Sequence, residues 1–304
     1  MGYQILDGKS TAERLRKDIA ERVKTTVAQG GKRPCLVAVI VGNNPASVAY
    51  VSNKDKACRE VGFESRLLQL NTDITELELI EEIKKLNRDK EVDGIIVQLP
   101  LPSHINPDAV IAAMDPAKDV DGFHPISAGK LMLGLPTFYP ATPMGIVTLL
   151  REYNIETRGK HCVVLGRSNI VGRPIANMLS QKGIAKTASL SGGCGVSGDC
   201  TVTVCHSRTP DIKKFTLQAD IIIAAIGKAN FLTADMVKDG AVVIDVGINS
   251  VEDPDSPRGW KLVGDVDFEA VAPKCSYITP VPGGCGPMTI VSLLENTLIA
   301  AENK

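Results

Sequence analysis

Two lysines, Lys54 and Lys56, are separated by one residue in the stretch "NPASVAYVSNKDKACREVG" (44–62). The stretch begins with Asn-Pro, a typical helix N-cap and first helical residue, and ends on a typical C-terminal glycine. At about 100° per residue, Tyr50 and Lys54 fall one turn apart within an apolar stripe, whereas Lys56 falls on the charged side. The rest of the stripe is Val51, Ala57, Cys58 and Val61.

A core-facing lysine has two interpretations. Desolvation lowers the pKa of a lysine, which makes Lys54 a candidate proton carrier near neutral pH. Alternatively, its stem packs against the core while the ammonium reaches water. The helix pattern alone leaves both open.

Three other features of the sequence place polar groups or bare backbone where ligands bind. Gln98 follows an aliphatic run at the carboxyl end of an expected buried strand, and its amide needs a partner such as a lysine. Asp119 and Asp121 lie beside a glycine in "KDVDGFHP" (118–125), a pattern that solvated loop acids also produce. "TPVPGGCGPMT" (279–289) has three prolines and three glycines, which indicates either a close ligand approach or a sharp turn.

A glycine-containing turn in "HCVVLGRSNIVGRPIANML" (161–179) indicates a nucleotide site. An apolar strand leads into a turn with Gly166 and Gly172 and then into a helical pattern, an arrangement that can hold a pyrophosphate. The spacing G-x-S-x-x-x-G departs from G-x-G-x-x-G, so a tight turn of any doubly wound fold is the alternative.

The next expected strand indicates which nucleotide would bind. An NAD site usually has an acidic residue at this strand end, but "CTVTVCHSRT" (200–209) ends with His206, Ser207 and Arg208. Arg167 lies in the glycine turn. Because guanidinium groups pair with phosphate in a bidentate fork, the pattern predicts NADP rather than NAD.

Strand and helix patterns alternate along the chain, which predicts parallel strands covered on both faces in an α/β fold. Strands are expected at 34–42, 65–71, 92–102, 160–166, 200–207, 219–227 and 240–247. Helices are expected at 46–61, 75–89 and 287–304. The Pro/Gly-rich passage 133–145 is the expected hinge between domain 1–140, joined by the closing helix 287–304, and domain 141–286.

Composition narrows the class of protein. The 304 residues suffice for two domains, and a net charge of −1 offers no basic surface for nucleic acid or anionic membranes. No apolar run approaches the roughly 18–20 residues of a membrane span, and no hydrophobic signal core follows Met1. Eight cysteines without any C-x-x-C pair predict a reduced, cytoplasmic protein without a metal site.

The Gly/Ser-rich stretch 183–200 predicts a mobile, non-catalytic loop.

Six motifs together resemble the bifunctional methylenetetrahydrofolate dehydrogenase/methenyltetrahydrofolate cyclohydrolase family. In chain order they are "AYVSNK", "GIIVQLPLP", "KDVDGFHP", "VVLGRSNIVGRP", "TVCHSRT" and "TPVPGGCGPMT". The resemblance implies two α/β domains, the second a Rossmann-like dinucleotide-binding domain, with a folate cleft between them. It implies a homodimer formed through the cofactor domain. It also implies oxidation of 5,10-methylene-tetrahydrofolate by NADP, followed by hydrolysis to 10-formyl-tetrahydrofolate.

The resemblance also assigns residue roles. Tyr50 would stack on the aminobenzoyl group, Lys54 would handle the proton of hydrolysis, Gln98 would bind Lys54, and Asp121 would bind the pterin. The implied lining of the folate cleft also includes Val97, Leu99, Pro282, Gly283, Gly284, Cys285 and Gly286. The implied cofactor contacts are Gly166, Arg167, Ser168, Ile170, Val171, Gly172, Ser207, Arg208 and Ile248. Ser127 stands where the family has asparagine, and Cys285 where it has valine.

Two alternatives use the same features. Another two-domain NAD(P)-dependent dehydrogenase, of the shikimate or amino-acid type, would also use a lysine and an aspartate, but Gln98 and the loop at 280–287 favour folate. A non-catalytic nucleotide-binding regulator would keep the glycine turn and need no polar set in the first half.

Overall fold

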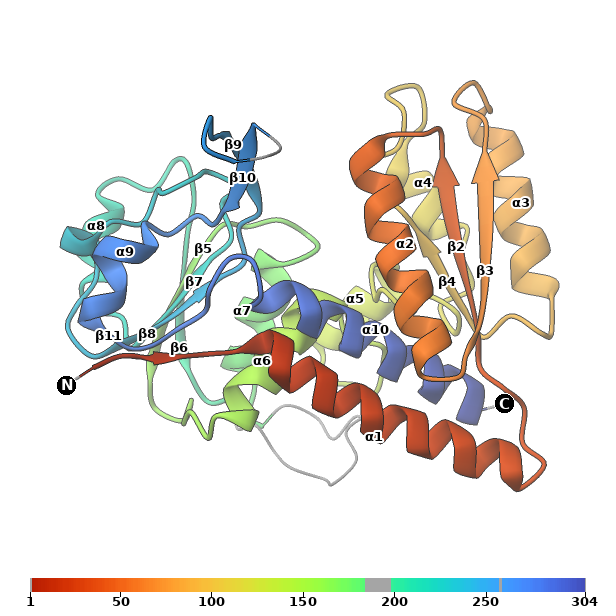
Figure 1. Cartoon of the computed structure of the whole chain (residues 1–304), viewed down its shortest axis with the longest axis horizontal. Coiled ribbons are helices and arrows are strands. Elements are labelled where there is room, and N and C mark those ends of the chain that lie inside the picture. Colours follow the sequence, from red (N-terminus) through yellow and green to blue (C-terminus); the bar gives the residue numbers. More distant parts are fainter. Residues whose placement is uncertain (1, 184–197, 257–258, 304) are drawn as a thin grey trace. The chain divides into compact units, whose positions relative to one another are not determined.

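The computed structural model describes residues 2–183, 198–256 and 259–303, which form two compact units (Figure 1). The large-sheet unit contains the described residues of 2–12 and 142–289, and the small-sheet unit contains 13–141 and 290–303. The sequence grouped residues 1–140 together. The N-terminus differs because strand β1 (Gln4–Ile5) pairs with β11 (Cys275–Ile278) of the large sheet.

The small-sheet unit is built on three parallel strands in the order β3-β2-β4, counted among the described residues. They are β2 (Cys35–Val41), β3 (Glu64–Leu70) and β4 (Gly94–Val97). Every residue of β2 is buried, as expected for a central parallel strand. Helices α3 (Glu76–Arg88) and α4 (Pro107–Ala112) pack on one face of the sheet, and α2 (Pro45–Glu60) contacts β2 and β3 from the other.

The expected helices and strands of this half are confirmed, with one shortened strand. The strand expected at 92–102 ends at Val97. Pro100 and Pro102 follow closely, and proline has no N–H to donate to a strand ladder. The sequence did not predict α1 (Gly8–Ala28) or α5 (Pro125–Met132).

The closing helix α10 (Cys285–Glu302) packs within the small-sheet unit over its residues from 290 onward. Arg22 of α1 pairs with Glu295 at 2.5 Å and with Glu302 at 3.1 Å. The helix begins two residues earlier than expected, since Pro287 is tolerated in a first helical turn.

The large-sheet unit contains a parallel sheet in the order β1-β11-β8-β7-β5-β6 among its described residues. The remaining strands are β5 (His161–Leu165), β6 (Thr201–Cys205), β7 (Ile221–Ala224) and β8 (Ala241–Asp245), all four predicted from sequence. The chain passes from β5 to β6 on one side and then to β7 on the other. This reversal is the switch point at which doubly wound sheets bind ligands.

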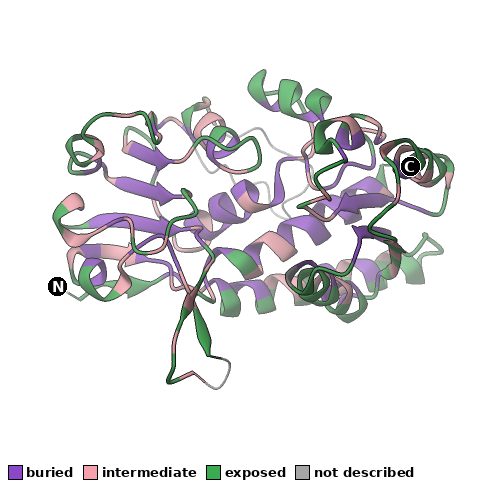
Figure 2. Cartoon of the chain, turned by 90° about the horizontal axis from the view of Figure 1, so that it is seen from above, coloured by how far each residue is buried: buried purple, intermediate pink, exposed green. Residues whose placement is uncertain are grey.

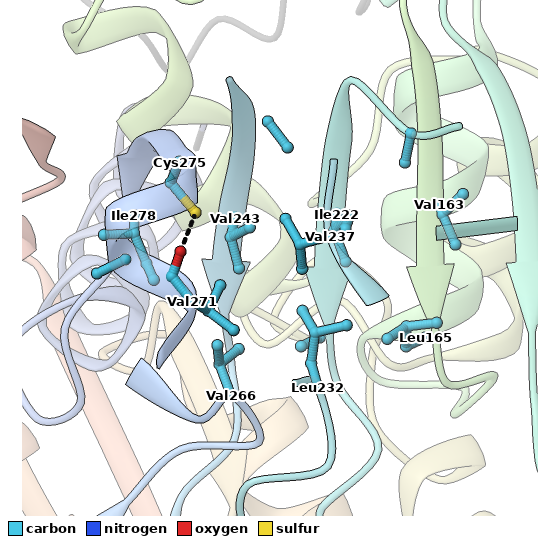
Figure 3. Packing of buried hydrophobic residues seen from close by; sticks show 14 of the residues in the cluster. Val163, Leu165, Ile222, Leu232, Val237, Val243, Val266, Val271, Cys275 and Ile278 are labelled. Carbon is cyan, nitrogen blue, oxygen red and sulfur yellow. Dashed lines mark hydrogen bonds between the residues drawn. The ribbon is translucent and has the colours of Figure 1, made fainter. Parts of the chain in front are cut away.

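The core of the large-sheet unit combines strand residues with the segments that cover them (Figure 3). Its labelled strand members are Val163, Leu165, Ile222, Val243, Cys275 and Ile278, and Leu232, Val237, Val266 and Val271 cover them. The helical segments of this unit are α6 (Ala141–Glu152), α7 (Gly172–Ser180), α8 (Ile212–Thr216), η1 (Ala234–Met236), α9 (Phe268–Val271) and η2 (Ala272–Lys274).

An antiparallel pair, β9 (Asn249–Glu252) and β10 (Trp260–Val263), forms an arm that the sequence did not predict. Its residues are exposed or half-buried, in contrast to the buried parallel strands (Figure 2). No helix among the described residues is long and apolar enough to cross a membrane. The predicted loop 183–200 lies largely outside the described residues, which omit 184–197.

Candidate functional site

Lys54 and Gln98 meet at the carboxyl end of the small sheet, as the sequence predicted. The Lys54 ammonium donates a long hydrogen bond of 3.4 Å to Gln98 Oε1. Gln98 follows β4 directly, and its backbone N–H donates to the carbonyl of Val39 at 2.9 Å. Its amide group donates to the carbonyl of Leu99 at 2.7 Å, so the oxygen remains turned to the lysine.

Tyr50 does not occupy the core-facing position that the apolar stripe predicted, and Lys54 does so only in part. Val51, Ala57, Cys58 and Val61 are all buried, but Lys54 is half-buried and Tyr50 is 45% exposed. Helical periodicity predicts which face of the helix a side chain lies on, but not whether that side chain lies over the sheet or beyond the strand ends. Because α2 follows β2, its first half lies near the strand ends, where little of the sheet is left to cover Tyr50.

Asp121 joins this pair from the loop before α5. The segment that carries it runs parallel to β4, with Ile95 N–H donating to the carbonyl of Lys118 at 2.8 Å and Ile95 bridging Asp119. Both segments then continue toward the strand end that carries Gln98. Burial raises the pKa of the Asp121 carboxyl group, and the Lys54 charge acts in the opposite direction. The structure therefore places Lys54, Gln98 and Asp121 in one polar cluster.

Lys118, which the sequence analysis gave no role, anchors this loop to the end of α3. Its buried ammonium donates to the carbonyls of Leu86, Asn87 and Asp89 at 2.9, 2.8 and 2.6 Å. These carbonyls lie at the C-terminal end of α3, where a cation is favourable.

Asp119 anchors the other end of the loop and is fully buried. Its carboxylate accepts the backbone N–H groups of Phe123 and His124 at 3.2 and 2.7 Å and the Ser127 hydroxyl at 3.2 Å. Burial raises the pKa of Asp119. Ser127 thus donates a hydrogen bond within the loop.

Asn296 of α10 holds the middle of the loop. Its side-chain amide donates to the carbonyls of Val120 and Tyr139 at 2.8 and 3.0 Å. Gly122 has a φ of 71°, and a Cβ atom there would approach the backbone of Tyr139 and Pro140 to 2.7 Å. The sequence contains one sign of this contact, because Asn296 is a polar residue inside the apolar pattern of the last helix.

The glycine turn of the large-sheet unit has the tight geometry expected of a phosphate site. Gly166 has a φ of 119°, and a side chain there would collide with the carbonyl of Ala225. A side chain at Gly172 would collide with the carbonyl of Gly166. Ser168 Oγ accepts the N–H groups of Val171 and Gly172 at 3.2 and 3.3 Å, which closes the turn onto α7.

The turn after β6 lies beside the glycine turn. Gly166 N–H donates to the carbonyl of Cys205 at 2.8 Å, which joins the two strand ends. His206 Nδ1 accepts the Arg208 N–H at 3.2 Å and thereby shapes the second turn. Arg167, Ser207 and Arg208 are exposed. The predicted cofactor residues Arg167, Ser168, Ile170, Val171, Gly172, Ser207 and Arg208 therefore come from two adjacent turns.

Ile248 and the Pro/Gly-rich loop lie farther along the same sheet edge. Ile248 follows β8 and is 48% exposed. The loop follows β11, where Gly283 accepts the Lys9 N–H and Gly284 N–H donates to Pro280, both at 2.9 Å. Cys285 is buried, which raises the pKa of its thiol. These groups belong to the large-sheet unit, whereas Lys54, Gln98 and Asp121 belong to the small-sheet unit.

Comparison with known proteins gives consistent matches to one family. The model of the tetrahydrofolate dehydrogenase/cyclohydrolase catalytic domain matches residues 6–121, and that of the corresponding NAD(P)-binding domain matches 140–304. The chain is 57% identical over 300 residues to the bifunctional protein FolD of Porphyromonas gingivalis, covering 99% of this chain and 97% of that protein.

Solved structures show the same similarity. The bifunctional FolD methylenetetrahydrofolate dehydrogenase/cyclohydrolase of Campylobacter jejuni superposes with a TM-score of 0.90 at 47% identity, covering 99% of both chains. The Trypanosoma brucei FolD structure, complexed with NADP and an inhibitor, has a TM-score of 0.90 at 36% identity and covers 100% of this chain and 98% of that one.

Proposed function

Because this chain belongs to the tetrahydrofolate dehydrogenase/cyclohydrolase family, we propose that it is a bifunctional folate enzyme of one-carbon metabolism. It oxidises 5,10-methylene-tetrahydrofolate with NADP and hydrolyses the 5,10-methenyl product to 10-formyl-tetrahydrofolate. The observation that carries this proposal is the cluster of Lys54, Gln98 and Asp121 at the carboxyl end of the small sheet. The chain is similar over its full length to bifunctional enzymes of this family. This similarity argues against the two alternatives, a shikimate-type dehydrogenase and a non-catalytic nucleotide-binding regulator.

The dehydrogenase step requires alignment more than acid–base chemistry. Bound NADP supplies the hydride acceptor. The nitrogens beside the methylene carbon stabilise the cation left by hydride loss, so the protein mainly holds the folate in place. Asp121 accepts N–H bonds from the amino-pyrimidine edge of the pterin, and exposed Tyr50 offers its ring to the aminobenzoyl group. Val97, Leu99 and residues 282–286 line the folate.

The hydrolysis step requires a proton carrier beside the cationic methenyl carbon. As the general base, the Lys54 nitrogen accepts a proton from the attacking water, and Gln98 holds that nitrogen by the 3.4 Å contact. A charged lysine would repel the cationic substrate. Asp121 contributes a negative charge on the same side of the cluster.

NADP rather than NAD is the proposed cofactor. Arg167 and Arg208 project from adjacent turns with Ser207, and together they match the charge and hydrogen-bonding needs of a 2′-phosphate. Gly166 to Gly172 would hold the pyrophosphate, and Ile248 would contact the nucleotide. The proposed chemistry needs no metal, because the hydride goes to NADP and the proton to Lys54.

The proposed assembly is a cytoplasmic homodimer formed through the large-sheet unit. Among the described residues, strand β6 lies at the edge of its sheet with Val204 38% exposed, and such an edge can join a second copy. Among the described cysteines, seven are free and buried thiols, which suits a reducing compartment.

Two assays on the purified protein test the function. We expect methenyl-tetrahydrofolate to lose its near-ultraviolet band without any nucleotide, faster than in a protein-free blank. We also expect methylene-tetrahydrofolate oxidation to be more efficient with NADP than with NAD. A protein that binds NADP but catalyses neither reaction would refute the proposal.

Replacing Asp121 by asparagine should raise the KM for the folate about 10- to 100-fold, since a charge-assisted hydrogen bond contributes about 1.5–3 kcal/mol. The pH dependence should differ as well. The pKa of Asp121 is raised above the ordinary 3.8, so its carboxylate is protonated at a higher pH than that of an exposed aspartate. The KM of the unmodified enzyme should therefore rise as the pH falls through this raised pKa, and the variant should lack this dependence.

The control for this experiment is Asp73→Asn, which changes an exposed aspartate of the same unit. Its KM for the folate should equal that of the unmodified enzyme at every pH. A folate KM that is identical in Asp121→Asn and Asp73→Asn would exclude Asp121 from pterin binding.

A further inference from the structure

Two buried carboxylates of the large-sheet unit have no role in the function proposed above. Asp245 is the last residue of β8 and is 3% exposed, and Asp265 precedes α9 and is fully buried. Burial raises the pKa of Asp245 to about 6, with the Asp265 charge acting in the same direction. Charged groups are rarely buried unless hydrogen bonds compensate them, so their partners indicate what they do.

Asp265 binds the loops that follow two neighbouring strands. Its Oδ2 accepts the backbone N–H groups of Ile226 and Gly227 at 2.7 and 2.8 Å. Its Oδ1 accepts the Lys228 N–H and the side-chain amide of Asn249, both at 2.9 Å. Three consecutive N–H groups of the loop after β7 and the side chain of Asn249, the first residue of β9, therefore share one carboxylate.

Asp245 in turn fixes the position of Asp265. Its Oδ1 accepts the N–H groups of Gly247 and Asp265, both at 2.9 Å, and its Oδ2 accepts the Val266 N–H at 3.0 Å. The Asp245 N–H donates to Thr279 Oγ1 at 2.7 Å, which attaches the network to the end of β11.

Two glycines make room for these carboxylates. A side chain at Gly264 would collide with the Asp245 carboxylate, and one at Gly247 would collide with the Asp265 carboxylate. Neither glycine has a positive φ, so the close approach of the carboxylates, and not turn geometry, requires glycine at these positions. Glycine at positions 247 and 264 thus leaves the space that the two carboxylates occupy.

The network holds two exposed isoleucines at the ligand-binding edge of the sheet. Ile226 is 36% exposed, and its N–H is held by Asp265. Ile248 is 48% exposed, and both of its chain neighbours are held, Gly247 by Asp245 and Asn249 by Asp265. Both loops follow strands on the β7 side of the switch point between β5 and β7.

We propose that Asp265 is a positioning residue for the nicotinamide nucleotide, because it clamps the loops after β7 and β8 so that Ile226 and Ile248 present a fixed apolar surface to a flat ring of the cofactor. The inference rests on the proposed function. A surface fixed before binding avoids the entropy cost of ordering two loops around the ligand. The role of Asp265 is to order these loops, and it makes no contact with the cofactor itself.

The test compares Asp265→Asn with Asp267→Asn. The first variant keeps the shape of the side chain but turns one acceptor into a donor that faces backbone N–H groups. The second changes a nearby acid that caps α9 through Ala270 and binds neither loop. We expect Asp265→Asn to raise the KM for NADP at least about 10-fold, with kcat at saturating NADP within about threefold. Nucleotide-free hydrolysis should not change, and Asp267→Asn should match the unmodified enzyme in all three measurements.

A double-mutant cycle with Ile248→Ala separates positioning from general stability. If Asp265 acts by holding Ile248, the two substitutions together should raise the KM for NADP by less than the product of their separate effects. Asn249→Ala removes one donor to Asp265 without altering a buried charge. This variant should raise the KM for NADP by a smaller factor than Asp265→Asn does. It therefore tests the positioning role of Asp265 even if Asp265→Asn fails to fold.

Three results would contradict the inference. An unchanged KM for NADP in Asp265→Asn and Asn249→Ala, an equal loss of both activities, or a multiplicative double mutant would each overturn positioning by Asp265. Failure of the proposed function has a different signature, because the unmodified protein would then catalyse neither reaction.

Discussion

Replacing Lys54 by methionine is expected to slow the hydrolysis of 5,10-methenyl-tetrahydrofolate by about 100- to 10,000-fold, the range that a positioned acid–base group contributes. Methionine keeps an unbranched, flexible stem and removes the nitrogen that contacts Gln98 at 3.4 Å. The measurement is the decay of the near-ultraviolet band without nucleotide, corrected for the uncatalysed rate.

The control for this substitution is Lys56→Met. Lys56 is on the same helix, its side chain is 78% exposed, and it pairs only at 4.0 Å with Glu60. Exposed pairs of this kind contribute little, so Lys56→Met should keep full hydrolysis. NADP binding by Lys54→Met should also persist, since the glycine turn belongs to the large-sheet unit. Hydrolysis at the unmodified rate in Lys54→Met would refute the proton-carrier role.

Replacing Arg167 and Arg208 together by alanine is expected to raise the KM for NADP at least about 100-fold and to change the KM for NAD less than about threefold. Each guanidinium would lose a charge-assisted bond to the 2′-phosphate of about 1.5–3 kcal/mol, and NAD lacks this phosphate. Initial rates of methylene-tetrahydrofolate oxidation with each nucleotide measure the effect.

Arg158→Ala is the matched control for the arginine pair. Arg158 belongs to the same unit, its side chain is 72% exposed, and it pairs at 4.0 Å with Asp199. It should leave both Michaelis constants unchanged. If the double variant raised the KM for NAD as much as that for NADP, the assignment of a 2′-phosphate site would be wrong.

The local sequence predicted α2 well because its determinants are local. Asn44 Oδ1 accepts the Ser47 N–H at 3.2 Å, and Gly62 has a φ of 84°, as expected of a cap and a stop. Periodicity also gave the correct direction for the buried stripe and placed Lys54 on the side of Gln98. Periodicity did not predict that Tyr50 is exposed, because the sequence of a helix does not show how far the neighbouring sheet extends along it.

The loop that presents Asp121 shows the opposite case. The pattern "KDVDG" gave the acids and the turn, but nothing local indicates that Lys118 binds three carbonyls at the end of α3 or that Asn296 binds Val120 from the other end of the chain. Such partners are separated by up to 176 positions, so only the folded chain brings them together.

By itself, the sequence determined the α/β class, four strands of the large sheet, the glycine turn with Arg167, the following strand end with Arg208, and the family through six motifs in order. These features depend on hydrophobic periodicity and on short motifs, which act over a few residues. The tertiary structure alone decided that β1 joins the large sheet, that Lys54 is only half-buried, and that Asp245 and Asp265 hold two loops. Burial and hydrogen bonding between distant segments set these features, and both depend on which chain segments pack together.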